Sequence, residues 1–149
     1  MVKKKIFKVV FTSLFFILAI CIFGVGLISA RDQVRGRSKD LRIKTSLAQI
    51  RTIAQIEYNK VGTFVGVCTG TLLTSTGDYA ALSADIIANG GTSTCYALAT
   101  SYCVKATLKT DPARTFCVDS TGVAKEYPFG SLNECTGTSP ANAITCEND

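Results

Sequence analysis

Three segments with different hydrophobic patterns follow one another along the chain. The first, residues 9–29, is an apolar run of 21 positions without a charged side chain. At a rise of about 1.5 Å per residue, a helix of this length crosses a hydrocarbon core of roughly 30 Å. A single segment in lipid must satisfy its own backbone hydrogen bonds, so it crosses as a helix. The pattern predicts a transmembrane helix over 9–29 behind a basic cytoplasmic leader, residues 1–8.

The second segment, residues 30–60, has the pattern of an amphipathic helix, which we call the stalk helix. It contains no Pro, and Gly36 is its single Gly. Apolar positions recur at steps of three and four, which gathers them on one helical face. That face comprises Ile43, Leu47, Ile50, Ile53, Ala54 and Val61, and the opposite face carries Arg42, Lys44, Gln49, Arg51, Gln55 and Asn59. The residues expected to pack this helix against the remainder of the protein are Leu41, Leu47, Ile50 and Ile53.

The third segment, residues 61–149, reads as a small mixed domain, which we call the head. A short helix is expected over 78–88, with Asp78 as its cap and Gly90-Gly91 after its end. Strand-like stretches rich in Tyr, Val, Thr and Cys follow at 94–99, 102–108, 115–119 and 123–126. So small a sheet needs cover on one face, and the stalk helix has the only amphipathic surface long enough. The chain therefore predicts an α+β fold, in which a long helix packs against an antiparallel sheet of three or four strands.

Cysteines add cross-links to this picture. Six of the seven lie in the head, at Cys68, Cys95, Cys103, Cys117, Cys135 and Cys146, and Cys21 lies in the apolar run. An even number of cysteines in a small polar domain is typical of disulfides formed in an oxidising compartment. The expected disulfides therefore place the head on the outer side of the membrane. The count of basic residues does not decide the orientation, because Lys and Arg flank the apolar run on both sides. Six cysteines allow fifteen pairings, of which we expect Cys68–Cys95, Cys103–Cys146 and Cys117–Cys135.

A cleaved signal peptide ending at residues 28–30 is the alternative to a retained helix. The apolar run is longer than the 7–15 residues typical of a signal peptide, and Ile28 is large for a cleavage site. Retention of the helix is therefore the favoured interpretation, with a single-pass membrane protein as the result.

Charge and chemistry exclude several functions. Residues 1–60 hold twelve Lys and Arg against three acids, whereas residues 61–149 hold four against eight. The basic charge sits on the stalk, where it suits anionic lipid headgroups or a solvated face. No base-contacting groups are interleaved with it, so nucleic-acid binding is not expected.

Catalysis is not expected either. The chain has no His, so the usual general base and the commonest nitrogen ligand for metals are missing. The cysteine spacings contain no C-x-x-C, which disfavours zinc binding and redox catalysis. The acids Asp85, Asp111 and Asp119 would suit local backbone bonds in turns better than a cation site. We expect neither a cofactor nor a metal.

The combination of parts resembles the type IV pilins and pseudopilins of bacteria. A basic patch, a membrane-crossing helix that continues as an amphipathic helix, and a small disulfide-linked sheet occur in that order. The resemblance covers roughly residues 29–126 and is carried by the S-A-R-D segment at 29–32, the helix at 40–59, and C-V-D-S-T-G at 117–122.

The prepilin cleavage motif is present only in degenerate form. Prepilins resembling this chain carry Gly or Ala followed by F-T-x-x-E at the start of the apolar helix. Here Phe11 and Thr12 match, but Val10 precedes them and Phe15 stands in place of the Glu. The resemblance implies a prepilin peptidase as a partner, and this departure leaves cleavage open.

Two functions follow from these expectations. The first is a structural subunit of a type IV pilus or pseudopilus-like filament, which packs with copies of itself or other pilins through its N-terminal helix and displays its head outward. The second is a single-pass, membrane-anchored surface protein for binding or adhesion that does not polymerise. The missing Glu favours the second, because that side chain sets subunit stagger in the family.

Overall fold

The computed structural model describes residues 33–130, 135, 145 and 146. Its contacts divide the chain into two units between Arg35 and Gly36, and the fold below is that of the second unit. The predicted leader and transmembrane segment, residues 1–29, lie outside the described residues. Among the helices that are described, none combines the length and the apolar character needed to cross a membrane.

The stalk helix is described over residues 33–61. Its inner face repeats at steps of three and four through Ile43, Leu47, Ile50 and Ala54, each of which is fully buried. The helix ends where Gly62 adopts a positive φ of 74° and its N–H bonds to the carbonyl of Tyr58 at 2.7 Å. Glycine takes this left-handed conformation without steric cost, as expected for a residue just after a helix.

A compact connection joins the stalk helix to the sheet. A 3-10 turn, η1 (Val65–Val67), leads into a short hairpin of β1 (Cys68–Thr69) and β2 (Leu72–Leu73). The hairpin was not predicted, because its strands are too short to show a pattern. The helix α2 (Gly77–Ala88) follows, close to the expected 78–88. The prediction that Asp78 caps this helix was wrong. The N-cap is Thr76, which makes no side-chain capping bond, and Asp78 lies in the first turn.

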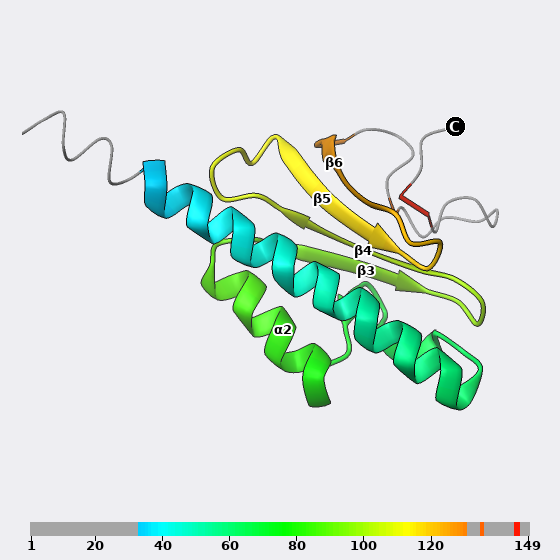
Figure 1. Ribbon diagram of the computed structural model, residues 1–149. Coiled ribbons are helices and arrows are strands. Elements are labelled where there is room, and N and C mark those ends of the chain that lie inside the picture. The colour runs from blue at the N-terminus through cyan, green and yellow to red at the C-terminus, as the bar shows by residue number, and fades with distance from the viewer. Residues whose placement is uncertain (1–32, 131–134, 136–144, 147–149) are drawn as a thin grey trace, which may run out of the picture. The chain divides into compact units, whose positions relative to one another are not determined.

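The main sheet is a four-stranded antiparallel meander in sequence order (Figure 1). This confirms the predicted α+β architecture. Its strands are β3 (Ser93–Ala97), β4 (Tyr102–Thr107), β5 (Arg114–Asp119) and β6 (Ala124–Pro128). Each strand lies within three residues of its predicted bounds.

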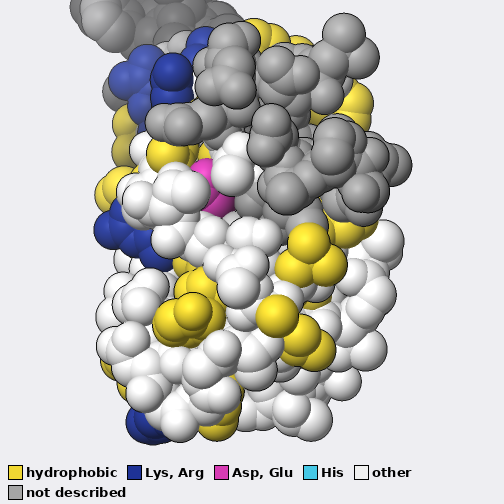
Figure 2. Space-filling view, turned by 90° about the vertical axis from the view of Figure 1, so that its right-hand side faces the viewer, with side chains coloured by type: hydrophobic (Ala, Val, Ile, Leu, Met, Phe, Trp, Pro, Cys, Tyr) yellow, Lys and Arg dark blue, Asp and Glu magenta, His cyan; other side chains and the backbone are white. Residues whose placement is uncertain are grey.

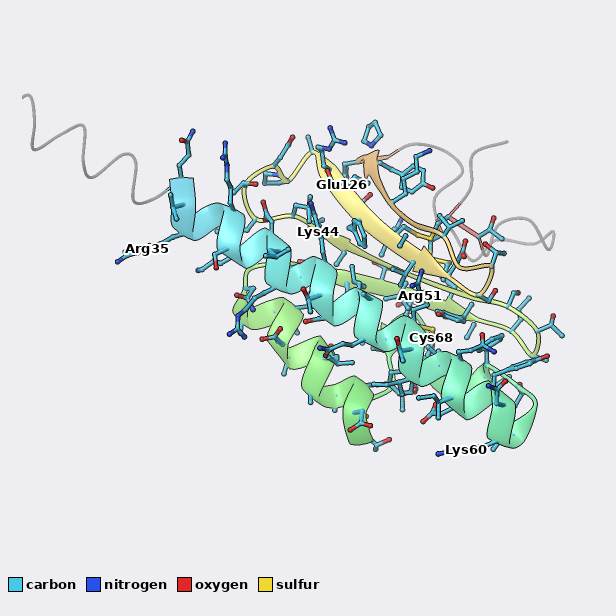
Figure 3. All side chains as sticks on the ribbon, viewed as in Figure 1. Arg35, Lys44, Arg51, Lys60, Cys68 and Glu126 are labelled. Atoms are coloured by element: carbon cyan, nitrogen blue, oxygen red, sulfur yellow. A yellow bond between two sulfur atoms is a disulfide. The ribbon has the colours of Figure 1, made fainter. Side chains whose placement is uncertain are left out.

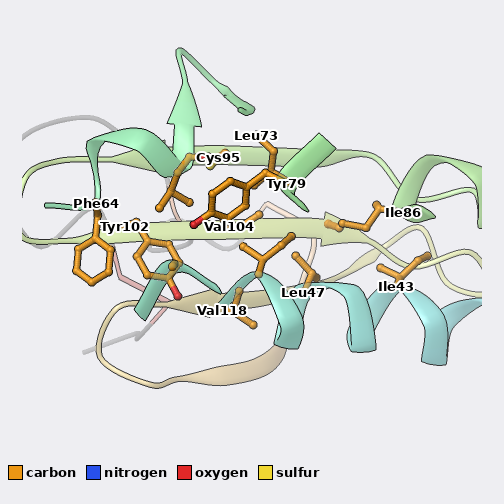
Figure 4. Packing of buried hydrophobic residues seen from close by; sticks show 14 of the residues in the cluster. Ile43, Leu47, Phe64, Leu73, Tyr79, Ile86, Cys95, Tyr102, Val104 and Val118 are labelled. Carbon is orange, nitrogen blue, oxygen red and sulfur yellow. Dashed lines mark hydrogen bonds between the residues drawn. The ribbon is translucent and has the colours of Figure 1, made fainter. Parts of the chain in front are cut away.

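The main core lies between the sheet and the two helices, which run side by side across one face of the sheet (Figure 1). Because successive side chains on a strand point to opposite faces, Cys95, Val104 and Val118 share the helix-facing side through their cross-strand register. Figure 4 shows these residues packed with Ile43, Leu47 and Ile86 from the helices. Gly91 is buried where the layers meet, since a Cβ there would lie about 3.0 Å from Ile86 and from a backbone carbonyl.

Polar contacts fasten the stalk helix to the sheet. Lys44 forms an ion pair with Glu126 of β6, and Figure 3 shows the two residues facing each other. Glu126 also pairs with Arg114 of β5 at 3.1 Å. Further along the helix, Arg51 donates a hydrogen bond to the carbonyl of Gly122 at 2.8 Å.

The four stalk residues expected to pack against the head differ in how deeply they are buried. Leu47 and Ile50 lie in the core, and Ile53 is partly buried against it. The expectation for Leu41 was wrong, because 65% of its surface is exposed. Leu41 precedes Leu47 by six residues. At about 100° per residue this is about 600°, or about 120° short of two full turns, so the Leu41 side chain points well away from the core. Val61 is likewise exposed.

Candidate functional site: the surfaces of the head and stalk

Disulfides cover part of the second face of the sheet. On this side the register places Cys103 opposite Asp119, and Cys117 opposite Lys105 on one strand and Lys125 on the other. A second cluster of buried residues forms here, separate from the core under the helices, and consists of Cys103, Cys117, Tyr127, Cys135 and Cys146. The sheet is therefore buried by helices on one face and partly covered by cystines on the other, where Lys125 remains exposed.

The disulfide pattern corrects two of the three predicted pairs. The bond Cys68–Cys95 is confirmed and ties the β1–β2 hairpin to β3. The other two bonds are Cys103–Cys135 and Cys117–Cys146, not Cys103–Cys146 and Cys117–Cys135. Cys103 and Cys117 lie on adjacent strands and the same face, so the choice of partner depends on the path of the C-terminal chain, which local sequence does not specify.

Asp119 lies on the same face at the end of β5, opposite Cys103. It is fully buried, and its Oδ1 accepts hydrogen bonds from the N–H of Thr121 at 2.9 Å, the hydroxyl of Thr121 at 2.7 Å and the N–H of Val123 at 3.1 Å. Its Oδ2 accepts the N–H of Cys146 at 2.7 Å. A buried carboxylate needs such donors to replace water. Asp119 therefore shapes the β5–β6 turn and holds the C-terminal cystine against the sheet.

The outer face of the stalk helix carries a narrow uncharged stripe. We define the outer stripe by five residues at helical spacing, Leu41, Thr45, Ala48, Thr52 and Ile56. Leu41 is 65% exposed and Ile56 48%. Two hydroxyls of the stripe turn back onto their own helix: Thr45 donates to the carbonyl of Leu41 at 2.8 Å, and Thr52 to that of Ala48 at 3.2 Å. These bonds satisfy the hydroxyls locally, so the stripe presents a largely apolar surface.

A second apolar surface lies at the end of the head where the stalk helix ends. Val61, Val65 and Leu98 are each at least half exposed there. These residues come from the end of the stalk helix, from η1 and from the β3–β4 turn, which the bond between the N–H of Phe64 and the carbonyl of Ala99 holds together. Figure 2 shows mostly hydrophobic and uncharged side chains across this end, an acidic side chain above and to the left of its middle, and Lys and Arg along its left-hand margin.

Two of the hollows among the described residues are shallow clefts. One, of about 460 Å³, lies between β2, α2 and the start of β3; it has no charged lining residue and is bordered by Leu72 and Ile87. The other, of about 350 Å³, lies between the stalk helix and the β5–β6 turn and includes Arg51, Gln55 and Asp119. Neither brings together an acid, a base and a nucleophile.

The acids considered as a cation site do not converge. Asp85 accepts from the hydroxyl of Ser46, Asp111 from the N–H of Ala113, and Asp119 bonds as described above. Within residues 33–130 and the three described positions beyond, no three Cys, Asp or Glu residues are grouped so that they could hold a metal ion.

Two buried tyrosines have perturbed hydroxyls. Burial raises the pKa of Tyr79 well above its usual value, and a hydrogen bond to the Glu57 carboxylate at 2.8 Å raises it further. Burial also raises the pKa of Tyr102, with an added contribution from the charge of Asp119 that Arg51 partly opposes. The Tyr102 hydroxyl has no hydrogen-bond partner among the described residues. Both groups stay protonated at neutral pH, so neither is a ready general base.

The remaining sequence-derived candidates lie outside the described residues. These are the degenerate prepilin motif at Val10, Phe11, Thr12 and Phe15 and the cysteine of the apolar run, Cys21. Comparison with protein-family models, with curated proteins and with solved structures gave no significant match.

Sequence reasoning missed the outer stripe. The signal was present, because Leu41, Ala48 and Ile56 recur at steps of seven and eight on one side of the helix. The face was interpreted as polar because its flanking Lys and Arg residues dominate the pattern, and because threonine is counted as polar. Only the structure shows that the threonine hydroxyls point back to the backbone.

Proposed function

We propose that this protein is a structural subunit of a type IV pilus or pseudopilus-like filament. In this proposal the apolar run 9–29 anchors the chain in the membrane before assembly. The stalk helix then packs with the helices of neighbouring subunits, and the disulfide-linked head faces outward.

The outer stripe is the observation that carries the proposal. A helix whose inner face is fully buried by its own sheet has no internal need for apolar groups on its outer face. Leu41 and Ile56 expose their side chains there all the same, separated by small or internally satisfied residues. Small residues at a helix surface permit a close approach of a second helix, and apolar flanks supply the driving force. The stripe therefore suits a neighbouring helix.

The cross-linked head agrees with an extracellular position. Its three disulfides tie β1 to β3, Cys135 to β4 and Cys146 to β5. Such bonds persist in oxidising compartments and stabilise a small domain mainly by restricting its unfolded state. A subunit at a filament surface benefits from both properties.

A solitary membrane-anchored surface protein is the second candidate. The residues that favour it are Val10 and Phe15, which replace the small residue and the Glu of the prepilin motif. Without that Glu, the contact that sets subunit stagger in the family is lost.

Photo-cross-linking separates the two candidates. The full chain is expressed in bacterial membranes with a photoreactive amino acid at Ala48, in the outer stripe, or at Val65, an exposed apolar control on η1. A filament subunit gives a ladder of cross-linked oligomers from position 48 that is strongly reduced by Leu41→Arg and unaffected by Val65→Arg. Monomers alone from position 48, or a ladder insensitive to Leu41→Arg, would overturn the proposed packing.

A further inference from the structure

Basic side chains gather at the end of the unit where the stalk helix begins. Arg37, Lys39 and Arg42 are exposed on the helix at this end. The turn between β4 and β5 and the C-terminal end of α2 reach the same end of the sheet (Figure 1). The turn contributes Lys109, which is also exposed. Lys109 lies 67 positions beyond Arg42 in the sequence, so only the fold brings it to this end.

Asp40 holds the Lys109 turn against the stalk helix. Its Oδ1 accepts the N–H of Lys109 at 2.6 Å and that of Thr110 at 3.1 Å, and the Thr110 hydroxyl bonds to Oδ2. Gly36 permits this approach, since a Cβ there would lie 2.5 Å from the Thr110 methyl group. The side chain of Lys109 passes over Gly90 at the end of α2. The backbone of Lys109 is thereby held against the stalk helix, and the carbon stem of its side chain lies against the end of α2.

Three carboxylates lie at this end, and none of them forms an ion pair with Arg37, Lys39 or Lys109. The Asp40 carboxylate is 7% exposed and is occupied by the turn. Asp85 pairs with Arg42 at 3.5 Å, and Asp111 caps its own turn. Among the described residues, no ion pair involves Arg37, Lys39 or Lys109. Three cations are therefore available to an outside anion. The opposite end of the head differs, because hydrophobic and uncharged side chains cover most of it, with an acidic side chain among them and Lys and Arg only along one margin (Figure 2).

The position of this end along the chain indicates which anion it meets. Arg37 follows the last residue of the apolar run, Ser29, by eight positions. Even a fully extended chain of eight residues spans at most about 28 Å. If residues 9–29 cross a bilayer, as the proposed function holds, Arg37 lies within about 28 Å of the outer end of that segment and can reach the headgroups.

We propose that Arg37, Lys39 and Lys109 bind the phosphates of anionic phospholipids at the outer surface of the membrane. The inference rests on the membrane anchorage in the proposed function and does not depend on filament assembly. Opposite charge, the lack of internal partners and the short link to the apolar run all favour a lipid surface. Each cation near an anionic surface strengthens binding by about fivefold. Headgroup binding would hold the head close to the membrane.

Lipid selectivity of the full-length protein tests this site. The protein is reconstituted in phosphatidylcholine bilayers that contain spin-labelled phosphatidylglycerol or spin-labelled phosphatidylcholine, and the relative association constant is measured by electron paramagnetic resonance. We expect a several-fold preference for phosphatidylglycerol that weakens at high salt. Lys109→Gln should lower it by about two- to fivefold, and Lys39→Gln combined with Lys109→Gln should lower it further.

A matched variant controls for charge alone. Lys60→Gln combined with Lys125→Gln removes the same charge from exposed sites elsewhere in the fold and should leave the preference unchanged. Circular dichroism melting of each variant establishes that the head is folded. An inserted wild type without lipid preference, or a preference insensitive to Lys109→Gln, overturns the headgroup site and leaves the anchor standing. A chain that fails to remain in the bilayer overturns both proposals.

Discussion

The carboxylate of Asp119 accepts the backbone N–H of Cys146 at 2.7 Å, across 27 positions of sequence. The same cysteine forms the disulfide with Cys117, two residues before Asp119 on β5. One end of one strand therefore holds the C-terminal cysteine twice, by a covalent bond and by a hydrogen bond. Because the Asp119 carboxylate is fully buried, the position of Cys146 against β5 depends on the charge and acceptor oxygens of that one side chain.

Asp119→Asn is expected to destabilise the head. The amide keeps one acceptor oxygen, but its NH₂ group faces a donor where the carboxylate had accepted one. A buried donor left without a partner, together with the lost bonds to charge, should lower the free energy of unfolding by about 2–4 kcal/mol. Urea unfolding with intact disulfides, followed by circular dichroism, measures the change. Asp111→Asn, in an exposed turn, is the control and should have little effect; equal stability of the two variants would contradict the role given to Asp119.

The cystine map should contain Cys68–Cys95, Cys103–Cys135 and Cys117–Cys146. Digestion of the oxidised protein without reduction, followed by mass spectrometry, identifies the linked peptides. Replacing both Cys117 and Cys146 by Ser should cost about 3.5 kcal/mol of unfolding free energy, because the bond closes a loop of about thirty residues. A peptide linking Cys103 to Cys146 would show that the described pairing is wrong.

Leu47→Ala should destabilise the head far more than Leu41→Ala. Leu47 is fully buried, so its truncation leaves a cavity and should cost about 2–5 kcal/mol of unfolding free energy. Leu41 is 65% exposed, so its truncation should change the stability of the head by less than about 0.5 kcal/mol. Thermal and urea unfolding measure both variants. A large loss of stability for Leu41→Ala would place that side chain in the core and remove it from the outer stripe.

Stability should fall in alkaline solution. The pKa values of Tyr79 and Tyr102 are raised in the folded state, chiefly by burial. Below pH 10 the hydroxyls are protonated in folded and unfolded chains alike, and their contribution is fully present. Above about pH 10 the unfolded chain releases these protons while the folded chain retains them, so the free energy of unfolding decreases as pH rises. Urea midpoints measured between pH 8 and pH 11 test this direction, and a midpoint that rises over this range would refute it.

Tyr102→Phe should leave the protein equally stable or make it more stable at neutral pH. The Tyr102 hydroxyl is buried without a partner among the described residues, and removal of an unsatisfied polar group avoids its desolvation cost. Tyr79→Phe is the matched variant, and it should cost about 1 kcal/mol because it loses the bond to Glu57. Both replacements should also reduce the alkaline loss of stability. A destabilised Tyr102→Phe variant would mean that the hydroxyl has a partner after all.

The sequence alone determined the elements that depend on local pattern. The stalk helix, α2 and the four strands of the meander were all expected, because apolar spacing and turn residues act over a few positions. The number of cysteines likewise predicted disulfides. The inner face of the helix, with Leu47 and Ile50, followed from the three–four repeat.

The tertiary structure decided the relationships between distant positions. It selected the partners of Cys103 and Cys117, buried Asp119 beneath the C-terminal cystine, brought Lys109 to the start of the stalk helix, and turned Leu41 outward. Hydrophobic periodicity gives the faces of a helix or strand, but it does not specify which remote segment covers each face. That choice is made by packing and long-range hydrogen bonds, whose free energies exist only once the layers are assembled.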